Sequence, residues 1–102
     1  MVIKLFCQEI ELIKIDKSAT VLRPEYDGLA RFSESKIYFD SDNKFPVLMH
    51  EITHFFLFLS ANGSREDYTE EQICCIFGRM LYQLLLENGD DIIEKLKEYA
   101  NG

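Results

Sequence analysis

The 102-residue sequence has no long apolar run, and it is short of positive charge. Its longest apolar run, residues 55–59, falls far below the roughly 20 residues that a membrane-spanning helix needs. The chain has 11 Lys+Arg against 18 Asp+Glu, for a formal net charge of −7. Because nucleic acids and anionic membranes attract basic surfaces, this balance argues against both as partners.

Cysteine is also scarce, and the three residues present cannot all pair with one another. Residues 1–15 alternate apolar and polar side chains, without the basic start and continuous apolar block of a secretory signal. We therefore expect free thiols and a cytoplasmic location. Cys74 and Cys75 are adjacent, which fits neither C-x-x-C nor the usual zinc spacing, and we expect both in the core of a helix.

The length predicts one domain over residues 1–102, and a hydrophobic content of 47% is enough for one core. Alternation of apolar and polar residues predicts strands at 2–7 and 10–15. Two further strands, at 29–32 and 36–39, are predicted to form a hairpin. We expect the four strands to form a small antiparallel sheet.

Helical signals begin after the hairpin. The polar residues at 41–43 are good N-caps, and Pro46 suits a first helical turn. A helix is therefore predicted over residues 44–59, with Asn-Gly at 62–63 as its C-terminal signal.

Two more helices are predicted in the last third of the chain. Thr69 and Gln72 have the spacing of a capping box, which predicts a helix that runs to Glu87. The aspartates at 90–91 cap a short third helix that reaches Tyr99. Strands first and helices afterwards indicate an α+β fold rather than alternating βαβ units.

Residues His50, Glu51 and His54 form the pattern H-E-x-x-H inside the first predicted helix. Positions i and i+4 of a helix lie nearly above one another, so both imidazoles point to one side and can hold one Zn²⁺. Glu51 lies next to that side, where its carboxylate can accept a proton from a metal-activated water. The motif thus predicts a zinc site with Glu51 as general base.

The structural alternative is that both histidines are hydrogen-bonded core residues and the motif is accidental. However, His50 and His54 are the only histidines in the chain, and both flank the required glutamate. The rest of this helix is almost entirely apolar, where polar side chains without partners are unfavourable. A bound metal is the simplest partner for them.

A catalytic zinc site needs a third protein ligand, and no third histidine exists. If the second predicted helix packs antiparallel to the first, a carboxylate in its first turn can meet His54. We prefer Glu71 to Glu70, because the stripe that continues from Glu71 carries the small residues Cys75 and Gly78, which allow close approach of the helices. Glu70, Asp67 and a Cys75 thiolate stay open as alternatives.

The motif, a glutamate that opens the next helix, and the apolar run at residues 77–85 resemble small zincin-like metallopeptidases of bacteriophages and mobile elements. The chain is more loosely similar to the ImmA/IrrE metallopeptidase family. The resemblance covers roughly residues 28–88 and includes the hairpin just ahead of the motif. It implies a minimal zincin-like core, in which an H-E-x-x-H helix and two further helices follow the sheet.

This resemblance also implies roles for individual residues. His50, His54 and Glu71 would bind zinc, and Glu51 would act as general base. The strand just before the motif helix, residues 36–40, would border the substrate cleft and pair with an extended peptide. Cys74 and Cys75 depart from the family, where alanine- or asparagine-like residues are expected.

Three functions follow from the sequence. The first is a zinc metallopeptidase, with one Zn²⁺ per chain and a protein or peptide as substrate. The second is a non-catalytic zinc-binding interaction module of a phage or mobile element. The third is a small globular protein without a metal. The sequence leaves the substrate and the oligomeric state open.

Overall fold

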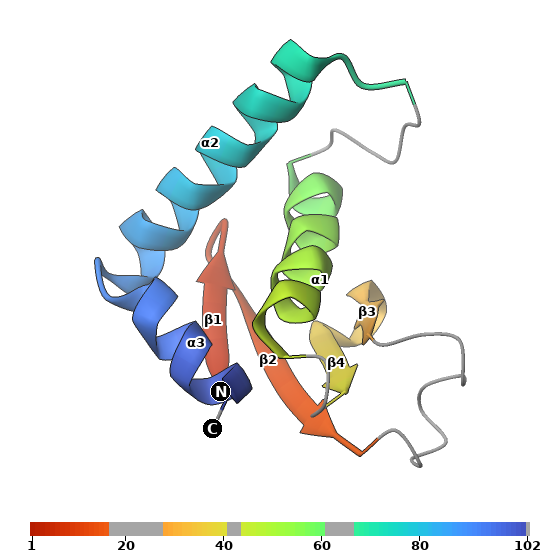
Figure 1. Cartoon of the computed structure of the whole chain (residues 1–102), viewed down its shortest axis with the longest axis vertical. Coiled ribbons are helices and arrows are strands. Elements are labelled where there is room, and N and C mark those ends of the chain that lie inside the picture. Colours follow the sequence, from red (N-terminus) through yellow and green to blue (C-terminus); the bar gives the residue numbers. More distant parts are fainter. Residues whose placement is uncertain (17–27, 41–43, 61–66, 102) are drawn as a thin grey trace.

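A computed structural model describes residues 1–16, 28–40, 44–60 and 67–101 of the chain. In these ranges it shows a four-stranded sheet followed by three helices, so the predicted α+β layout is confirmed (Figure 1). The strands are β1 (Val2–Leu5), β2 (Gln8–Ile15), β3 (Gly28–Arg31) and β4 (Lys36–Asp40). The helices are α1 (Lys44–Leu59), α2 (Glu70–Asn88) and α3 (Ile92–Asn101), and a short 3₁₀ turn spans Phe32–Glu34.

The strand order is β1-β2-β4-β3, and the sheet is mixed. β1 with β2 and β3 with β4 are antiparallel pairs, as alternation and the predicted hairpin suggest. β2 and β4 run parallel, with Leu12 beside Ile37, so the sheet is not antiparallel throughout as predicted. After β2 the chain forms β3 at the edge of the sheet and then β4 between β3 and β2. β4 therefore runs parallel to β2, where the sequence predicts an antiparallel pair.

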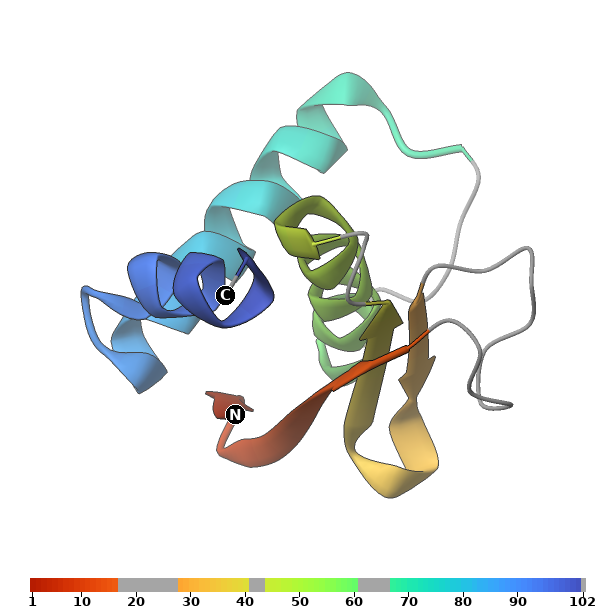
Figure 2. The ribbon, with the colours of Figure 1, turned by 60° about the horizontal axis from the view of Figure 1, so that its bottom comes forward.

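The three helices lie on one face of the sheet, so the domain has two layers (Figure 2). The burial of β2 follows from this: Ile10 and Leu12 face the helices and are buried, whereas Glu9 and Glu11 face solvent. From α1 the core receives Leu48, Ile52, Phe55 and Phe56, and from α2 and α3 it receives Met80, Leu84, Ile92, Leu96 and Ala100. Alternating strands over an apolar helical layer therefore form one core.

Local signals explain the helix bounds. α1 covers the predicted residues 44–59, and Pro46 lies in its first turn. Thr69 and Gln72 form the predicted capping box at the start of α2. α2 ends before Gly89, whose positive φ of 96° and N–H bond to the carbonyl of Leu85 terminate it. The predicted caps at 41–43 and the stop signal at 62–63 lie outside the described residues.

The third helix closes the core against the sheet. The hydroxyl of Tyr99 donates a hydrogen bond of 2.8 Å to the carbonyl of Leu12 on β2, and its ring packs edge-on against Phe39 of β4. None of the helices in the described ranges is long and apolar enough to cross a membrane.

Candidate metal centre

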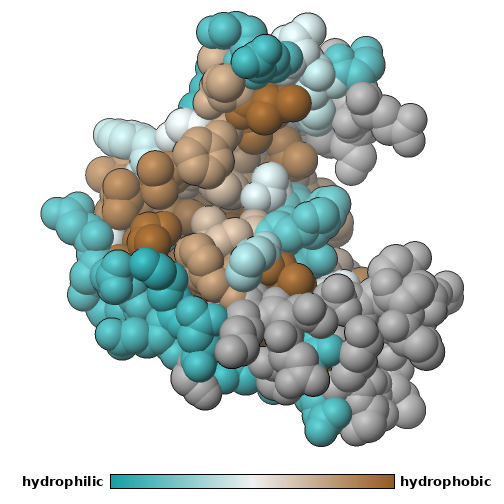
Figure 3. Space-filling view, viewed as in Figure 1, coloured by the Kyte–Doolittle hydropathy of each residue, from teal (hydrophilic) through white to brown (hydrophobic). Residues whose placement is uncertain are grey.

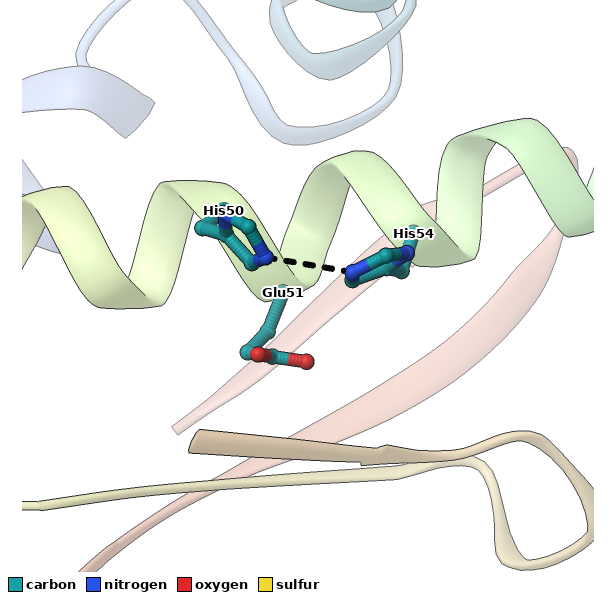
Figure 4. Close-up of side chains that lie close together, drawn as sticks. All are labelled: His50, Glu51 and His54. Atoms are coloured by element: carbon teal, nitrogen blue, oxygen red, sulfur yellow. Dashed lines mark hydrogen bonds between the residues drawn. The ribbon is translucent and has the colours of Figure 1, made fainter. Parts of the chain in front are cut away.

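His50 and His54 project together from α1, with their rings edge to face (Figure 4). Their Nε2 atoms are 3.2 Å apart and both side chains are exposed. Two ligands of a tetrahedral ion, each about 2.0–2.1 Å from it, lie roughly 3.3 Å from one another. The two Nε2 atoms are hydrogen-bonded to one another, and the same separation suits a shared metal ion.

Glu51 lies beside this pair but points toward the sheet (Figure 4). Its ligand oxygen and the two histidine nitrogens lie within 4.8 Å of one another, so the three residues form a group that could hold a metal ion. Unlike the histidines, Glu51 is buried, with 7% of its surface exposed. Its carboxylate accepts a hydrogen bond from the backbone N–H of Ala30 on β3.

Burial raises the pKa of the Glu51 carboxyl, because a charged carboxylate loses hydration there. His54, His50 and the Ala30 hydrogen bond oppose this effect and lower the pKa, yet burial dominates. A carboxyl with a raised pKa binds a proton more tightly at neutral pH than an ordinary glutamate does. Glu51 is thus a buried carboxyl beside the histidine pair that favours its protonated form more than an ordinary glutamate does.

An open hollow of ≈ 320 Å³ lies between α1 and β3, and all three residues of the motif line it. The opposite wall is formed by Gly28, Leu29, Ala30 and Phe32. The hollow therefore has an apolar wall from the sheet and a polar wall from the helix. A ligand in it would contact the histidine pair and the backbone of β3 together.

The strand that borders this hollow differs from the one the sequence predicts. β4 lies between β2 and β3 and is paired on both sides, so residues 36–40 have no free edge for a peptide. Among the described residues β3 is paired only with β4, and its other side lies along the hollow, where Glu51 accepts the N–H of Ala30. β3, the next strand along the chain after β2, lies at the edge, because β4 pairs with β2 inside the sheet.

Glu71 lies on α2 and is exposed, outside the group formed by the motif. The register of the helices explains this. α1 and α2 run in opposite directions (Figure 1), and the Oγ1 of Thr53 lies 3.4 Å from the Sδ of Met80. Arg79 is then level with His54, and Glu71 lies eight residues earlier, about 12 Å along the helix axis. The Glu71 ligand stays a prediction, and Glu70 is likewise exposed on α2.

Cys74 and Cys75 are exposed, so their predicted place in the core is wrong. The first half of α2 extends beyond the sheet, and its apolar residues Ile73 and Phe77 are 54% and 58% exposed. α2 packs against the core from Ile76 onward, and its buried residues are Met80 and Leu84. Figure 3 shows apolar surface over α2 and α1 on this face of the molecule. The direction of a helix depends on its tertiary contacts, which its own pattern does not specify.

Sequence reasoning missed the contribution of β3 to the site. Ala30 binds Glu51 through its backbone, which leaves no signal in the residue type. Gly28 lies in the hollow opposite Glu51, and its only signal is a glycine at the start of the predicted hairpin.

The group formed by His50, Glu51 and His54 fits a metal ion by its donor atoms, because two imidazole nitrogens and a nearby carboxylate suit zinc and similar transition metals. The exposed side of the pair leaves room for further ligands. No protein-family model matches the chain, and no curated protein or solved structure matches it either.

Proposed function

We propose that the chain is a zinc-dependent metallopeptidase in which His50 and His54 bind the zinc and Glu51 is the general base. The observation that carries this proposal is the convergence of two exposed Nε2 atoms, 3.2 Å apart, beside a buried carboxylate at an open hollow. Burying a carboxylate without a partner costs free energy, and a buried carboxylate that lines a cleft is often a functional group. Here the role is proton transfer beside the metal.

Bound zinc lowers the pKa of a coordinated water to about 7 and polarises a carbonyl oxygen. Glu51 would take the proton of the attacking water and become neutral, and it would return to the charged carboxylate when it passes that proton to the leaving amine. The Ala30 N–H holds the carboxylate beside the two imidazoles during both transfers. Leu29 and Phe32 provide an apolar wall that limits water around this exchange.

We propose an extended peptide as the substrate, laid along the unpaired side of β3, with the N–H of Ala30 left to Glu51. Strand addition at a sheet edge gives affinity through backbone hydrogen bonds and positions the peptide. A strand in that place would cross the hollow in front of His50 and His54, because Gly28–Arg31 and the histidines line opposite walls. The scissile carbonyl would then meet the metal.

Glu71 is the proposed third ligand, as the resemblance to zincin-like peptidases implies. It enters the site only if α2 moves along or toward α1. Two features make such a movement feasible: the first half of α2 has few neighbours, and the side chains from Glu70 to Cys75 are all exposed.

Zinc content and proteolysis test the proposal together. Protein purified without a histidine tag should contain about one zinc per chain and should cleave fluorescein-labelled casein. Glu51→Gln should keep the zinc and lose activity by about 100-fold or more, because it can no longer accept a proton. Glu98→Gln is the matched control, since Glu98 is exposed on α3 and does not line the hollow.

Two outcomes would reject the proposal. Activity at the wild-type level in Glu51→Gln would remove Glu51 from the mechanism. No more than a trace of zinc in the untagged protein would show that the chain does not bind the metal. It would rule out both the zinc peptidase and the zinc-binding interaction module.

A non-catalytic zinc-binding interaction module is the second candidate function. A specific observation favours it: large apolar side chains lie exposed on α2, Ile73, Phe77, Tyr82 and Leu86. Exposed apolar surface of this kind commonly marks a contact with another protein. Stoichiometric zinc without hydrolysis of casein or of a peptide library would favour this module over the peptidase.

The cysteines bear on the compartment. Cys7, Cys74 and Cys75 are free and exposed, and exposed thiols persist in a reducing environment. We therefore propose a cytoplasmic location, which thiol labelling in intact cells would test.

A further inference from the structure

Gly28 lies unusually close to the general base. A Cβ atom at position 28 would be 2.8 Å from the Cγ and 3.1 Å from the Oε1 of Glu51, and 3.0 Å from the Cγ1 of Val47. Carbon atoms in van der Waals contact are about 3.5–4.0 Å apart, so any side chain here would push Glu51 or the strand aside. Val47 and Glu51 lie one helical turn apart, and both face β3.

Backbone conformation does not explain this glycine. Among the described glycines only Gly89 has a positive φ, so position 28 has a φ that any residue adopts. What excludes a larger residue is space alone. The absent side chain lets the edge strand approach α1 closely at the level of Glu51.

The same strand also contacts the Glu51 carboxylate through a hydrogen bond. Ala30, two residues after Gly28, donates its backbone N–H to Glu51. Gly28 thus sets how close the strand comes to the helix, and Ala30 supplies the hydrogen bond that this approach makes possible. Neither residue has a side chain able to take part in proton transfer.

We propose that Gly28 is a positioning residue, which fixes the Glu51 carboxylate beside His50 and His54 by bringing β3 into contact with it. This inference rests on the proposed function, in which Glu51 transfers a proton. A substitution at 28 should displace the carboxylate while both histidines, which project from the exposed side of α1, stay in place. Such a variant should therefore keep metal binding and be impaired in proton transfer.

Gly28→Ala is the test, and Gly78→Ala is its matched control. A Cβ at Gly78 on α2 would meet no atom within 4 Å, so alanine there adds a methyl group without a contact. We expect Gly28→Ala to bind zinc within about twofold of wild type by calorimetry. Its kcat on a casein-derived peptide should fall by about 10- to 100-fold with little change in KM, since displacements near 1 Å have effects of that size. Gly78→Ala should keep the wild-type kcat and KM in zinc-saturated protein.

A second readout does not depend on activity. In protein with ¹³C-labelled glutamate, the Glu51 carboxyl resonance is identified by its loss in Glu51→Gln. It should shift in Gly28→Ala and stay in place in Gly78→Ala. If wild type hydrolyses nothing, the proposed function fails, and this resonance still decides whether Gly28 positions Glu51.

The double variant Gly28→Ala with Val47→Ala guards against a folding defect. It removes the Val47 Cγ1 that the new Cβ would meet at 3.0 Å and keeps the contact with Glu51. The kcat and the shifted resonance of Gly28→Ala should persist in it. Recovery of both to wild type would show that Gly28 only avoids Val47 and would overturn the proposal. An unmoved Glu51 resonance with wild-type kcat in Gly28→Ala would overturn it equally.

Discussion

The side chain of Asn88 pairs with the backbone of Lys4 as a neighbouring strand would. Its Oδ1 accepts the Lys4 N–H at 2.7 Å, and its Nδ2 donates to the Lys4 carbonyl at 2.8 Å. Lys4 lies on β1, at one edge of the sheet, and Asn88 is the last residue of α2. The end of this helix therefore satisfies an edge of the sheet that would otherwise be open.

Asn88→Ala should destabilise the protein by about 1–2 kcal/mol, because two backbone groups lose protein partners and return to water. The midpoint of urea unfolding should fall while the slope stays unchanged. Asn101→Ala serves as control, since Asn101 is exposed at the end of α3. An unchanged midpoint for Asn88→Ala would show that these bonds contribute nothing.

Glu87 stabilises the turn between β1 and β2. Its carboxylate accepts the N–H groups of Phe6 and Cys7, each at 2.6 Å. Both residues have positive φ values, 52° and 65°, which are unfavourable for side chains of this kind. Partial burial by itself would raise the pKa of Glu87, but hydrogen bonds from Gln83, Cys7 and Phe6 and the charge of Lys4 together lower it.

A carboxyl whose pKa is lower in the folded state favours folding when it is charged. This stabilisation is complete above the ordinary value of 4.5 and is lost as the pH falls below it toward the folded pKa. Glu87→Gln should therefore be less stable than wild type at pH 7, and the difference should shrink below about pH 4.5. Urea unfolding between pH 3 and 7 measures this, and a difference independent of pH would contradict it.

In the metal-free protein, Glu51 has the opposite effect on how stability changes with pH. Its pKa is raised, mainly by burial, so the folded state prefers the neutral carboxyl. The corresponding stability is present below the ordinary value of 4.5 and is lost as the pH rises through the folded pKa. With EDTA present at pH 7, Glu51→Gln should raise the melting temperature, because it removes a buried charge and keeps an acceptor for Ala30. A lower melting temperature would count against this.

Zinc should stabilise the wild-type fold by mass action. At a free concentration of 100 times the dissociation constant, one site adds about 2.7 kcal/mol. His54→Gln should lose most of this gain, because one of the two converging nitrogens is absent. Mg²⁺ is the control ion, since it prefers oxygen ligands and should leave the melting temperature unchanged. Equal stabilisation of wild type and His54→Gln by zinc would place the metal elsewhere.

The third ligand can be identified by calorimetry. Glu71→Gln should weaken zinc binding by about tenfold or more, whereas Glu70→Gln should stay within about twofold. Cys75→Ser tests the thiolate alternative. Because Glu71 lies about 12 Å along α2 from the level of His54, its binding also requires α2 to move. If Glu71→Gln keeps the wild-type affinity for zinc, Glu71 is not the third ligand. A loss of affinity in Glu70→Gln or in Cys75→Ser would then identify the ligand.

Features encoded within a few residues could be predicted from the sequence. The motif spacing puts His50 and His54 on one side of α1, and the capping box at Thr69 marks the start of α2. Both depend on contacts three or four positions apart, which a pattern specifies directly.

Features that depend on distant contacts could not be predicted. The parallel pairing of β2 with β4 joins strands separated by β3, and no local pattern encodes that choice. The exposure of Cys74 and Cys75 follows from the direction in which α2 leaves the core. The contact between Gly28 and Glu51 depends on how closely β3 approaches α1, which is a property of the assembled layers.

The two edges of the sheet are unequal, and this restricts how the molecule can associate. Asn88 occupies both backbone groups of Lys4 on the β1 edge, so among the described residues β3 is the edge more open to a further strand. That strand would lie over the hollow of His50 and His54. Self-association through this edge would therefore cover the two histidines, and dilution alone would expose them again.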